Sequence, residues 1–360
     1  MSATLEEVAR VAGVSITTAS RVLTQNTHPV RAATRQRVLK AAAKLQYKPN
    51  LLARGMRTER THTIGIIADD LLSPFTPPII RGIQDCLKEI DYLGLIVNSD
   101  WDPDIEREAI STLLSRAVEG IIFVESGRLA PTQELVKSQK PYMFVHRLFG
   151  APVQNSVVPD DYGGTRLVLE HLLALGHRRI GHIAGPQGWH SAQRRTDSYL
   201  DTLSQHGLEI DPALIIESDW EFEGGAVAMQ QLLHVSPRPT AVFAANDMMA
   251  LGAIETLRST GLRVPEDIAL TGYDNREISR SLAPRLTTVS LPTYQMGVTA
   301  AKLLWQKIQG SAHDVDEVQI CGRLYIRESC GALPAQRTHD ELDVATTVRH
   351  RLTGQQPEKR

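Results

Sequence analysis

Seven apolar runs, each followed by a stretch with helical periodicity, dominate the chain from Thr63 onward. The runs are TIGIIADD (63–70), LGLIVNSD (93–100), GIIFVES (120–126), YMFVHR (142–147), RRIGHIAG (178–185), TAVFAAND (240–247) and DIALTGYDN (267–275). Their apolar residues occupy successive rather than alternate positions, which is typical of parallel strands covered by helices on both faces. Strands that alternate with helices in this way predict a doubly wound α/β body.

The length of the chain indicates more than one domain. Its 360 residues, 42% of them hydrophobic, suffice for two lobes, which we expect at about 62–161 with 293–325 and at about 162–292 with a closing strand. We see no apolar run of membrane-spanning length and no signal sequence, so we expect a cytoplasmic protein that does not contact the membrane. The three cysteines stand far apart and predict ordinary thiols, with no metal and no cofactor.

Charge divides the chain into a basic head and an acidic body. Residues 1–60 contain eleven lysine or arginine residues against three glutamates, and the other 300 residues contain 28 basic and 38 acidic residues. The head therefore carries a net charge of +8 and the body −10. This asymmetry indicates a polyanionic partner for the head, although a merely solvated basic surface fits the charge pattern too.

The segment TLEEVARVAGVSITTASRVL, residues 4–23, has the pattern of two short helices joined at Gly13. Thr4 followed by Glu7 is typical of a capping box, and glycine permits a tight reversal. Ser15 is placed to cap the second helix. The inward face of that helix comprises Ala19, Val22 and Leu23.

A third helix is predicted to close a small core with the first two. Its core residues are Val38, Leu39, Ala42 and Leu45, with Tyr47 beyond its end. This is the helix-turn-helix pattern, in which the second helix enters the major groove of DNA. Any small three-helix bundle shares the spacing, so the pattern alone leaves both interpretations open.

Ile16, Thr17 and Arg21 fall outside the predicted core and are candidates for reading base edges. Arginine pairs with guanine through two hydrogen bonds, threonine bonds several bases, and isoleucine contacts the thymine methyl group. Ser20, Thr24 and Thr34 suit contacts to phosphate. The full set of candidates in this region is Thr4, Ser15, Ile16, Thr17, Thr18, Ser20, Arg21, Thr24 and Thr34.

The segment YKPNLLARGMRTERTHT, residues 47–63, follows the bundle with a stop at Pro49 and a short helical pattern after Asn50. Together with VARVAGVSITTASRVL, NDMMALGA and GYDN, in this order and spacing, it makes residues 1 to about 330 resemble the LacI/GalR family of bacterial transcription repressors. The resemblance implies a head at 1–48, a hinge helix and linker at 49–61 and a periplasmic-binding-protein-like body at 62–330. We expect residues 331–360 to form a polar, disordered tail.

The resemblance also implies a homodimer that binds a pseudo-palindromic double-stranded operator and inserts paired hinge helices into the minor groove. The positions that match the hinge contacts are Asn50, Ala53, Met56 and Arg57. Met56 stands at the wedge position, where the family usually has leucine, and its flexibility predicts a smaller gain on ordering. Arg31 stands where the family commonly has a serine-type cap, and a missing cap costs about 1 kcal/mol.

Polar and aromatic residues follow the predicted strands, at the sheet edge where such folds bind ligands. The candidates are Phe75, Thr76, His146, Arg147, Trp189, Ser191, Arg195, Trp220, Asn246 and Asp274, with Glu125, Ser126 and Asp161 as weaker ones. The resemblance implies that these positions contact an effector, Arg195 and Asp274 most consistently. A guanidinium and a carboxylate bond neighbouring hydroxyls, and aromatic rings cover the C–H faces of a sugar, so we expect a small carbohydrate.

Several alternatives stay open at this point. His146, Arg147 and Arg195 fit a carboxylate or phosphate, so a sugar acid or sugar phosphate is possible, and a cleft lined by tryptophans also fits a disaccharide. Trp189 replaces the arginine of nucleobase-binding relatives, which disfavours a purine. A nucleotide-dependent enzyme lacks a glycine-rich phosphate loop here, and a sugar-uptake protein leaves the basic head unexplained. Whether the effector induces or corepresses does not follow from the sequence.

Overall fold

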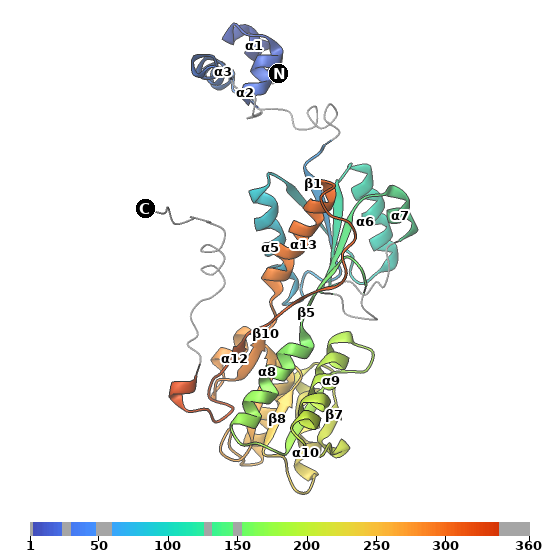
Figure 1. Ribbon diagram of the computed structural model, residues 1–360, viewed down its shortest axis with the longest axis vertical. Helices are drawn as coiled ribbons and strands as arrows, with labels where there is room; N and C mark the ends of the chain where they lie inside the picture. Colours follow the sequence, from blue (N-terminus) through green and yellow to red (C-terminus); the bar gives the residue numbers. More distant parts are fainter. Residues whose placement is uncertain (1–2, 24–29, 48–59, 126–131, 147–152, 338–360) are drawn as a thin grey trace. The chain divides into compact units, whose positions relative to one another are not determined.

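The computed structural model describes residues 3–23, 30–47, 60–125, 132–146 and 153–337. The chain divides into two compact units, Met1–His62 and Thr63–Arg360, which we call the head and the body (Figure 1). The predicted hinge helix and the residues of the tail from 338 onward lie outside the described residues. So do seven of the candidate site residues, namely Thr24, Asn50, Ala53, Met56, Arg57, Ser126 and Arg147.

The described residues of the head form three helices, α1 (Leu5–Ala12), α2 (Ile16–Leu23) and α3 (Ala32–Lys44). The predicted capping box is present, because Glu7 N donates to Thr4 Oγ1 at 3.2 Å and Thr4 N donates to the Glu7 carboxylate at 2.8 Å. Gly13 adopts a left-handed φ of +64°, which lets the chain reverse between α1 and α2. The buried core comprises Val8, Ala9, Ala12, Ala19, Val22, Val38, Ala41 and Ala42.

The third helix differs from the sequence prediction in its phase. Leu39 was expected in the core but is 48% exposed. The buried stripe follows Val38, Ala41, Ala42 and the partly buried Leu45, a spacing of three and four residues that leaves Leu39 to one side. The helix starts after Arg31, which makes no side-chain cap hydrogen bond, as its identity predicts.

The body contains two lobes, each built on a six-stranded sheet. In lobe 1 the strand order is β11 (Val318–Ile320), β5 (Ser156–Pro159), β4 (Tyr142–Val145), β3 (Gly120–Val124), β1 (Thr63–Ala68) and β2 (Leu93–Asn98). Its helices are α5 (Thr76–Glu89), α6 (Pro103–Ser115), α7 (Gln133–Ser138) and α13 (Thr293–Ile308). Every strand pair in this sheet is parallel, as the apolar runs predict.

In lobe 2 the order is β12 (Leu324–Tyr325), β10 (Thr287–Ser290), β9 (Ala269–Asp274), β8 (Ala241–Ala244), β6 (Ile180–Ala184) and β7 (Ile215–Glu217). Its helices are α8 (Asp161–Ala174), α9 (His190–Gln205), α10 (Phe222–His234), α11 (Asp247–Ser259) and α12 (Glu277–Ser281), with short 3₁₀ turns at Pro212–Leu214 and Pro334–Gln336. Only the pair β10 and β12 is antiparallel among the described strands of this sheet. The doubly wound α/β prediction is confirmed for both lobes.

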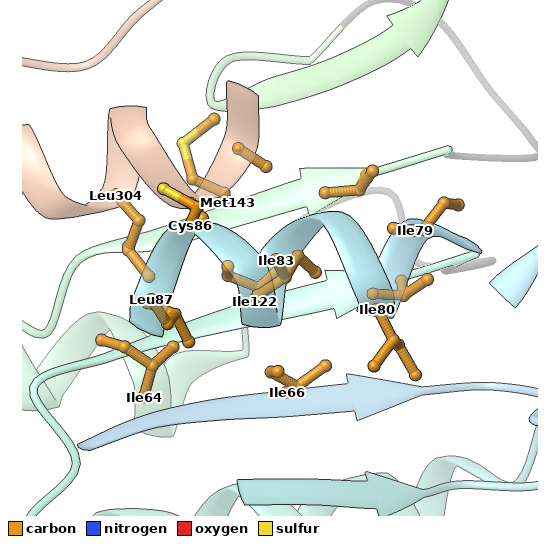
Figure 2. Close-up of a cluster of buried hydrophobic side chains, with 14 of the residues drawn as sticks. Ile64, Ile66, Ile79, Ile80, Ile83, Cys86, Leu87, Ile122, Met143 and Leu304 are labelled. Atoms are coloured by element: carbon orange, nitrogen blue, oxygen red, sulfur yellow. The ribbon is translucent and has the colours of Figure 1, made fainter. Parts of the chain in front are cut away.

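One part of the core of lobe 1 lies between the sheet and the helices α5 and α13, and a second part lies between the sheet and the helices α6 and α7. Figure 2 shows Ile79, Ile83 and Leu87 of α5 above Ile64 and Ile66 of β1. Each of these five side chains is at most 2% exposed, and full burial of such a side chain contributes about 1.5–3 kcal/mol. This packing holds the carboxyl ends of the strands, and the loops that follow them, in fixed positions.

The chain passes between the lobes after β5, after β10 and between β11 and β12, so both lobes contain distant parts of the sequence. The body also continues past the predicted end at residue 330. Ala332 is 2% exposed and belongs to the core of lobe 2, and Arg337 Nη1 lies 3.7 Å from Glu328 Oε1. Ala332 and Arg337 therefore contact the body beyond residue 330, although Gly331 and residues 333–336 are exposed.

Candidate functional site

The head presents the outward face of α2 that the sequence predicts. Ile16 is 47% exposed, and Thr17 and Arg21 are exposed as well. Ser15 Oγ accepts a hydrogen bond from Thr18 N at 3.1 Å and lies 2.9 Å from the Thr18 hydroxyl. This pair stabilises the first turn of α2, so that the exposed residues stand on a rigid helix.

The other candidates of the head occupy different environments. Thr4 is exposed but already engaged in the capping box, and Thr34 is half-buried. Ser20 is only 9% exposed, on the side of α2 that carries the buried Ala19. The predicted phosphate contact of Ser20 is therefore a poor fit to the structure, because little of its surface is available to a ligand.

The body contains a cavity of about 330 Å³ at the carboxyl ends of the strands, lined by residues of both lobes. Eight of the ten main effector candidates line it: Phe75, His146, Trp189, Ser191, Arg195, Trp220, Asn246 and Asp274. Of the weaker candidates, Glu125 also lines it. Asn246 caps α11 by accepting from Met249 N at 2.8 Å and donates to the carbonyl of Trp220 at 2.8 Å, so it joins two walls of the cavity.

An ion-pair network centred on Arg195 forms one end of the cavity. Arg195 is 3% exposed, and its Nε donates to Asp161 Oδ1 at 2.8 Å. Its Nη1 lies 3.6 Å from Asp274 Oδ1 and also donates to the carbonyl of Ala245. The guanidinium stacks over the ring of Tyr273, with 3.7 Å between Cζ and the ring centroid. Asp161 does not line the cavity, so it acts by positioning Arg195.

Burial perturbs the charges in this network. Burial lowers the pKa of Arg195, but Asp161 and Asp274 outweigh it and raise the pKa overall. For Asp274 burial is the largest effect and raises the pKa to about 7, against the attraction of Arg195. The nearby Asp247 is fully buried, and burial followed by repulsion from Asp274 raises its pKa well above the ordinary value. Perturbed carboxyl groups of this kind cluster at functional sites.

Glu125 forms a second polar centre, in lobe 1. It accepts hydrogen bonds from Ser73 Oγ at 2.9 Å and from the hydroxyl of Thr76, and its Oε1 lies 3.3 Å from Nδ1 of His146. Burial raises the pKa of Glu125, but His146, Thr76 and Ser73 together outweigh it, and the pKa is lowered. Thr76 is fully buried behind this carboxylate and does not line the cavity, so its predicted contact with a ligand is wrong.

Aromatic rings form the walls. Trp189 and Trp220 meet edge to face with 6.0 Å between their ring centroids, and Phe75 meets His146 in the same manner at 5.5 Å. The ring of Trp220 packs so closely on Gly185 that a Cβ added there would lie 2.3 Å from it. Glycine is therefore required at position 185 if Trp220 is to keep its place.

Several residues that line the cavity hold a left-handed backbone that non-glycine residues rarely adopt. They are Trp101 (φ +60°), Glu125 (φ +57°), His146 (φ +56°), Trp220 (φ +75°) and Asp274 (φ +105°). Such strain costs of the order of 1–3 kcal/mol for each residue and persists where surrounding structure fixes it, often at ligand sites. The strained backbone therefore marks the same cavity as the ion pairs.

The sequence analysis missed part of the lining. The additional residues are Asp70, Ser73, Pro74, Trp101, Glu221, Arg276 and Leu291. Asp70 ends one predicted apolar run and Trp101 directly follows another, so the same strand-end rule was available to find them. Within the described ranges no group of three or more His, Cys, Asp or Glu residues is arranged to hold a metal ion, and no helix is long and apolar enough to cross a membrane.

Comparisons with known proteins agree with this arrangement. Residues 4–50 match the family described as bacterial regulatory proteins, lacI family, and residues 169–330 match a periplasmic binding protein-like domain. The chain is 34% identical to the HTH-type transcriptional repressor CytR of Escherichia coli over 92% of this chain and 98% of that protein. It is 32% identical to catabolite control protein A of Priestia megaterium over 91% and 99%.

Solved structures show the same relationship over about nine-tenths of this chain. A lac repressor dimer bound to operator and the anti-inducer ONPF is 31% identical, with a TM-score of 0.73, over 92% of this chain and 100% of that chain. The transcriptional regulator CelR in complex with cellobiose is 33% identical, with a TM-score of 0.66, over 91% and 99%.

A helix-turn-helix head joined to a two-lobed body with a cavity at its strand ends defines a DNA-binding transcriptional regulator that has a ligand-binding body. The matches extend over nine-tenths of the chain at more than 30% identity. The chain belongs to the LacI family of bacterial regulatory proteins.

Proposed function

We propose that this regulator is a repressor whose operator affinity is controlled by a neutral carbohydrate bound in the cavity of the body. The observation that supports this proposal most directly is that Arg195, Asp274 and Trp220 lie together in the cavity. Arg195 and Asp274 can bond hydroxyl groups, and the centroid of the Trp220 ring lies 5.6 Å from Cζ of Arg195. A pyranose offers vicinal hydroxyls to the first two and a C–H face to the third.

The charge balance of the cavity favours a neutral ligand over an anionic one. Four acidic residues line it (Asp70, Glu125, Glu221 and Asp274), against two arginines and one histidine (Arg195, Arg276 and His146). Arg195 is already paired with Asp161 outside the lining, at 2.7 Å from Nη2. Asp274 is half protonated at pH 7, because its pKa is raised to about 7, but the acidic residues still outnumber the two arginines, so a carboxylate or phosphate would meet more repulsion than attraction.

A sugar acid or sugar phosphate is the second candidate. The observation in its favour is Arg276, whose side chain lines the cavity. Arg147, which the sequence suggests for the same role, lies outside the described residues. Relatives support a carbohydrate in general, since CelR was solved with cellobiose, and a lac repressor with operator and ONPF.

On the DNA side, we propose that Arg21, Thr17 and Ile16 read base edges in the major groove, because they are exposed on the rigid second helix of the head. Thr4, Ser15, Thr18 and Thr34 are proposed to position the phosphate backbone. Two chains, as a homodimer acting on the nucleoid in the cytoplasm, would then match a pseudo-palindromic operator.

A thermal-shift screen of the purified full-length protein tests the effector class. The ligands are neutral mono- and disaccharides, sugar acids and sugar phosphates, because a specific ligand raises the melting temperature by mass action. We expect a neutral sugar to raise it, and we expect Asp274→Asn to abolish that rise. A shift produced by anionic ligands alone would favour the second candidate and contradict the neutral one.

A further inference from the structure

The polar groups of the cavity fall into two sets that come from different parts of the sheets. The inner set follows the central strands: Glu125 after β3, His146 after β4, Asn246 after β8 and Asp274 after β9. All four side chains are largely buried, and Glu125, His146 and Asn246 are at most 7% exposed. The proposed function places the first sugar ring on Asp274 of this set, together with Arg195 and Trp220.

The outer set follows the strands at the opposite end of each sheet. It consists of Asp70 after β1, Trp101 after β2, Trp189 after β6 and Glu221 after β7. These residues are half-buried or exposed, with Trp101 at 47%. Its two carboxylates can accept hydrogen bonds from hydroxyls, as Glu125 and Asp274 of the inner set can, and its two indole rings provide flat faces for C–H groups.

The strand order gives the distance between the two sets. In lobe 1 the order β3, β1, β2 places Trp101 two strands away from Glu125, and in lobe 2 the order β8, β6, β7 places Glu221 two strands away from Asn246. Neighbouring strands lie about 4.8 Å apart, so the strand ends that carry Trp101 and Glu221 are about 10 Å from those that carry Glu125 and Asn246, whereas those of Asp70 and Trp189 are one strand away. One pyranose ring at the inner set is too short to reach the loop of Trp101 as well, whereas two linked rings span that distance.

The loop that carries Trp101 is held in place rather than free. Asp100 and Trp101 both have left-handed φ values, +52° and +60°. Asp102 N donates to Ser99 O at 2.9 Å, and Asn98 Oδ1 accepts from Leu71 N at 2.9 Å, which ties this loop to the β1–α5 loop that contributes Asp70. A strained turn that keeps an exposed indole at the mouth of a cavity indicates a ligand contact.

We propose that the outer set is a second sugar subsite, and that the effector is therefore a disaccharide or longer saccharide whose outer ring packs on Trp101. This inference rests on the proposed neutral-carbohydrate function. In this proposal Trp101, Asp70 and Glu221 select two-ring over one-ring sugars. The residues around Arg195 bind one sugar ring in either case.

Isothermal titration calorimetry on the full-length protein tests this assignment. The probes are cellobiose, lactose, maltose, sucrose and trehalose, with glucose, galactose and fructose as their one-ring counterparts. We expect one disaccharide to bind at least tenfold more tightly than its constituent sugars. Trp101→Ala should weaken that disaccharide about tenfold and leave one-ring affinities unchanged, because it removes a stacking surface that only the outer ring meets.

Two control variants separate stacking from damage to the loop. Trp101→Phe keeps an aromatic face and should retain most of the affinity. Leu72→Ala removes a side chain that is 94% exposed, lies on the neighbouring loop and does not line the cavity, so it should change nothing. The unliganded melting temperature of each variant shows that it is folded.

The possible results distinguish the two proposals. The first result is a one-ring sugar that binds as tightly as every disaccharide, and whose affinity falls in Asp274→Asn but does not change in Trp101→Ala. This result would overturn the second subsite and leave the proposed carbohydrate function intact. Binding of none of these neutral sugars, with binding of sugar phosphates or acids instead, would overturn both. A two-ring preference that persists in Trp101→Ala would refute the role of Trp101.

Discussion

Replacing Arg195 with alanine tests whether the buried ion pairs hold the effector cavity together. The Arg195 side chain is 4% exposed and serves two carboxylates, Asp161 and Asp274, that are each 4% exposed as well. Truncation leaves both acids without their main counter-charge and removes the group that stacks on Tyr273. Removing one partner of a buried ion pair costs about 3–5 kcal/mol, so we expect a loss of that size in the free energy of unfolding of the body.

The loss should depend on pH in a defined direction. Arg195 holds down the pKa of Asp274, which burial nevertheless raises to about 7, so the variant should raise this folded-state pKa further. A carboxyl group whose pKa is higher in the folded state than in the unfolded state favours folding at low pH. This contribution is complete below the pKa of the unfolded state, about 3.9, and it is lost as the pH rises through the pKa of the folded state. The penalty of Arg195→Ala should therefore be greatest at pH 8 and smaller at pH 5.

Urea unfolding of wild type and Arg195→Ala at pH 5 and pH 8 measures both effects. Arg194→Ala is the matched control, because Arg194 is the next residue on α9 and lies over the ring of Tyr162, with 4.9 Å between its Cζ and the ring centroid, instead of in the buried network. We expect it to cost less than about 1 kcal/mol. A cost below about 1 kcal/mol for Arg195→Ala, or one that is equal at both pH values, would refute this account of the network.

Three further predictions concern the two sites. Arg21→Ala should weaken binding to the specific operator by about 1–3 kcal/mol, measured by fluorescence anisotropy, and an equal loss on unrelated DNA would remove Arg21 from base reading. Affinity for a neutral sugar, measured by calorimetry, should rise about tenfold from pH 6 to pH 8, because the Asp274 carboxylate that accepts sugar hydroxyls forms around a pKa of about 7. In Asp274→Asn the affinity should no longer depend on pH. Affinity that does not change with pH in wild type would contradict this role of Asp274. Gly185→Ala should displace the Trp220 ring, which a new Cβ would approach to 2.3 Å, and so weaken sugar binding and shift tryptophan emission; unchanged affinity would show that Trp220 does not contact the sugar.

Seven strands of four to six residues were predictable from the sequence because they form continuous apolar runs, as strands buried on both faces do, although β2 is only partly buried. Of the five strands that were not predicted, β7, β11 and β12 are only two or three residues long, too short for such a signal, whereas β5 and β10 have four residues, as many as the predicted β4 and β8. The main cavity residues were predictable by the same means, since ligand contacts in parallel sheets follow the strand ends. Arg195 and Asp274, named from the sequence, do meet in the structure at 3.6 Å.

The errors concern the direction in which single side chains face. Thr76 begins α5 and faces inward to Glu125, whereas its neighbour Phe75 lines the cavity, and a strand-end rule does not separate adjacent residues. Leu39 was expected to be buried and Ser20 to be exposed, and the structure shows the reverse. In a short helix the sequence fixes the buried face only to within one residue, which is about a quarter of a turn. The left-handed turn at Trp101 contains no glycine, so nothing in its sequence predicted it.

The most direct test of the regulatory claim measures operator affinity with and without effector on one protein. An operator is first selected from random duplex DNA with the full-length protein, and anisotropy titrations then follow with the sugar that the thermal-shift screen identifies. Coupling between two sites is typically 1–3 kcal/mol, so we expect the sugar to change operator affinity by about 5- to 150-fold in wild type and to leave it unchanged in Asp274→Asn. An operator affinity that the bound sugar leaves unaltered in wild type would contradict the claim that the cavity controls the head.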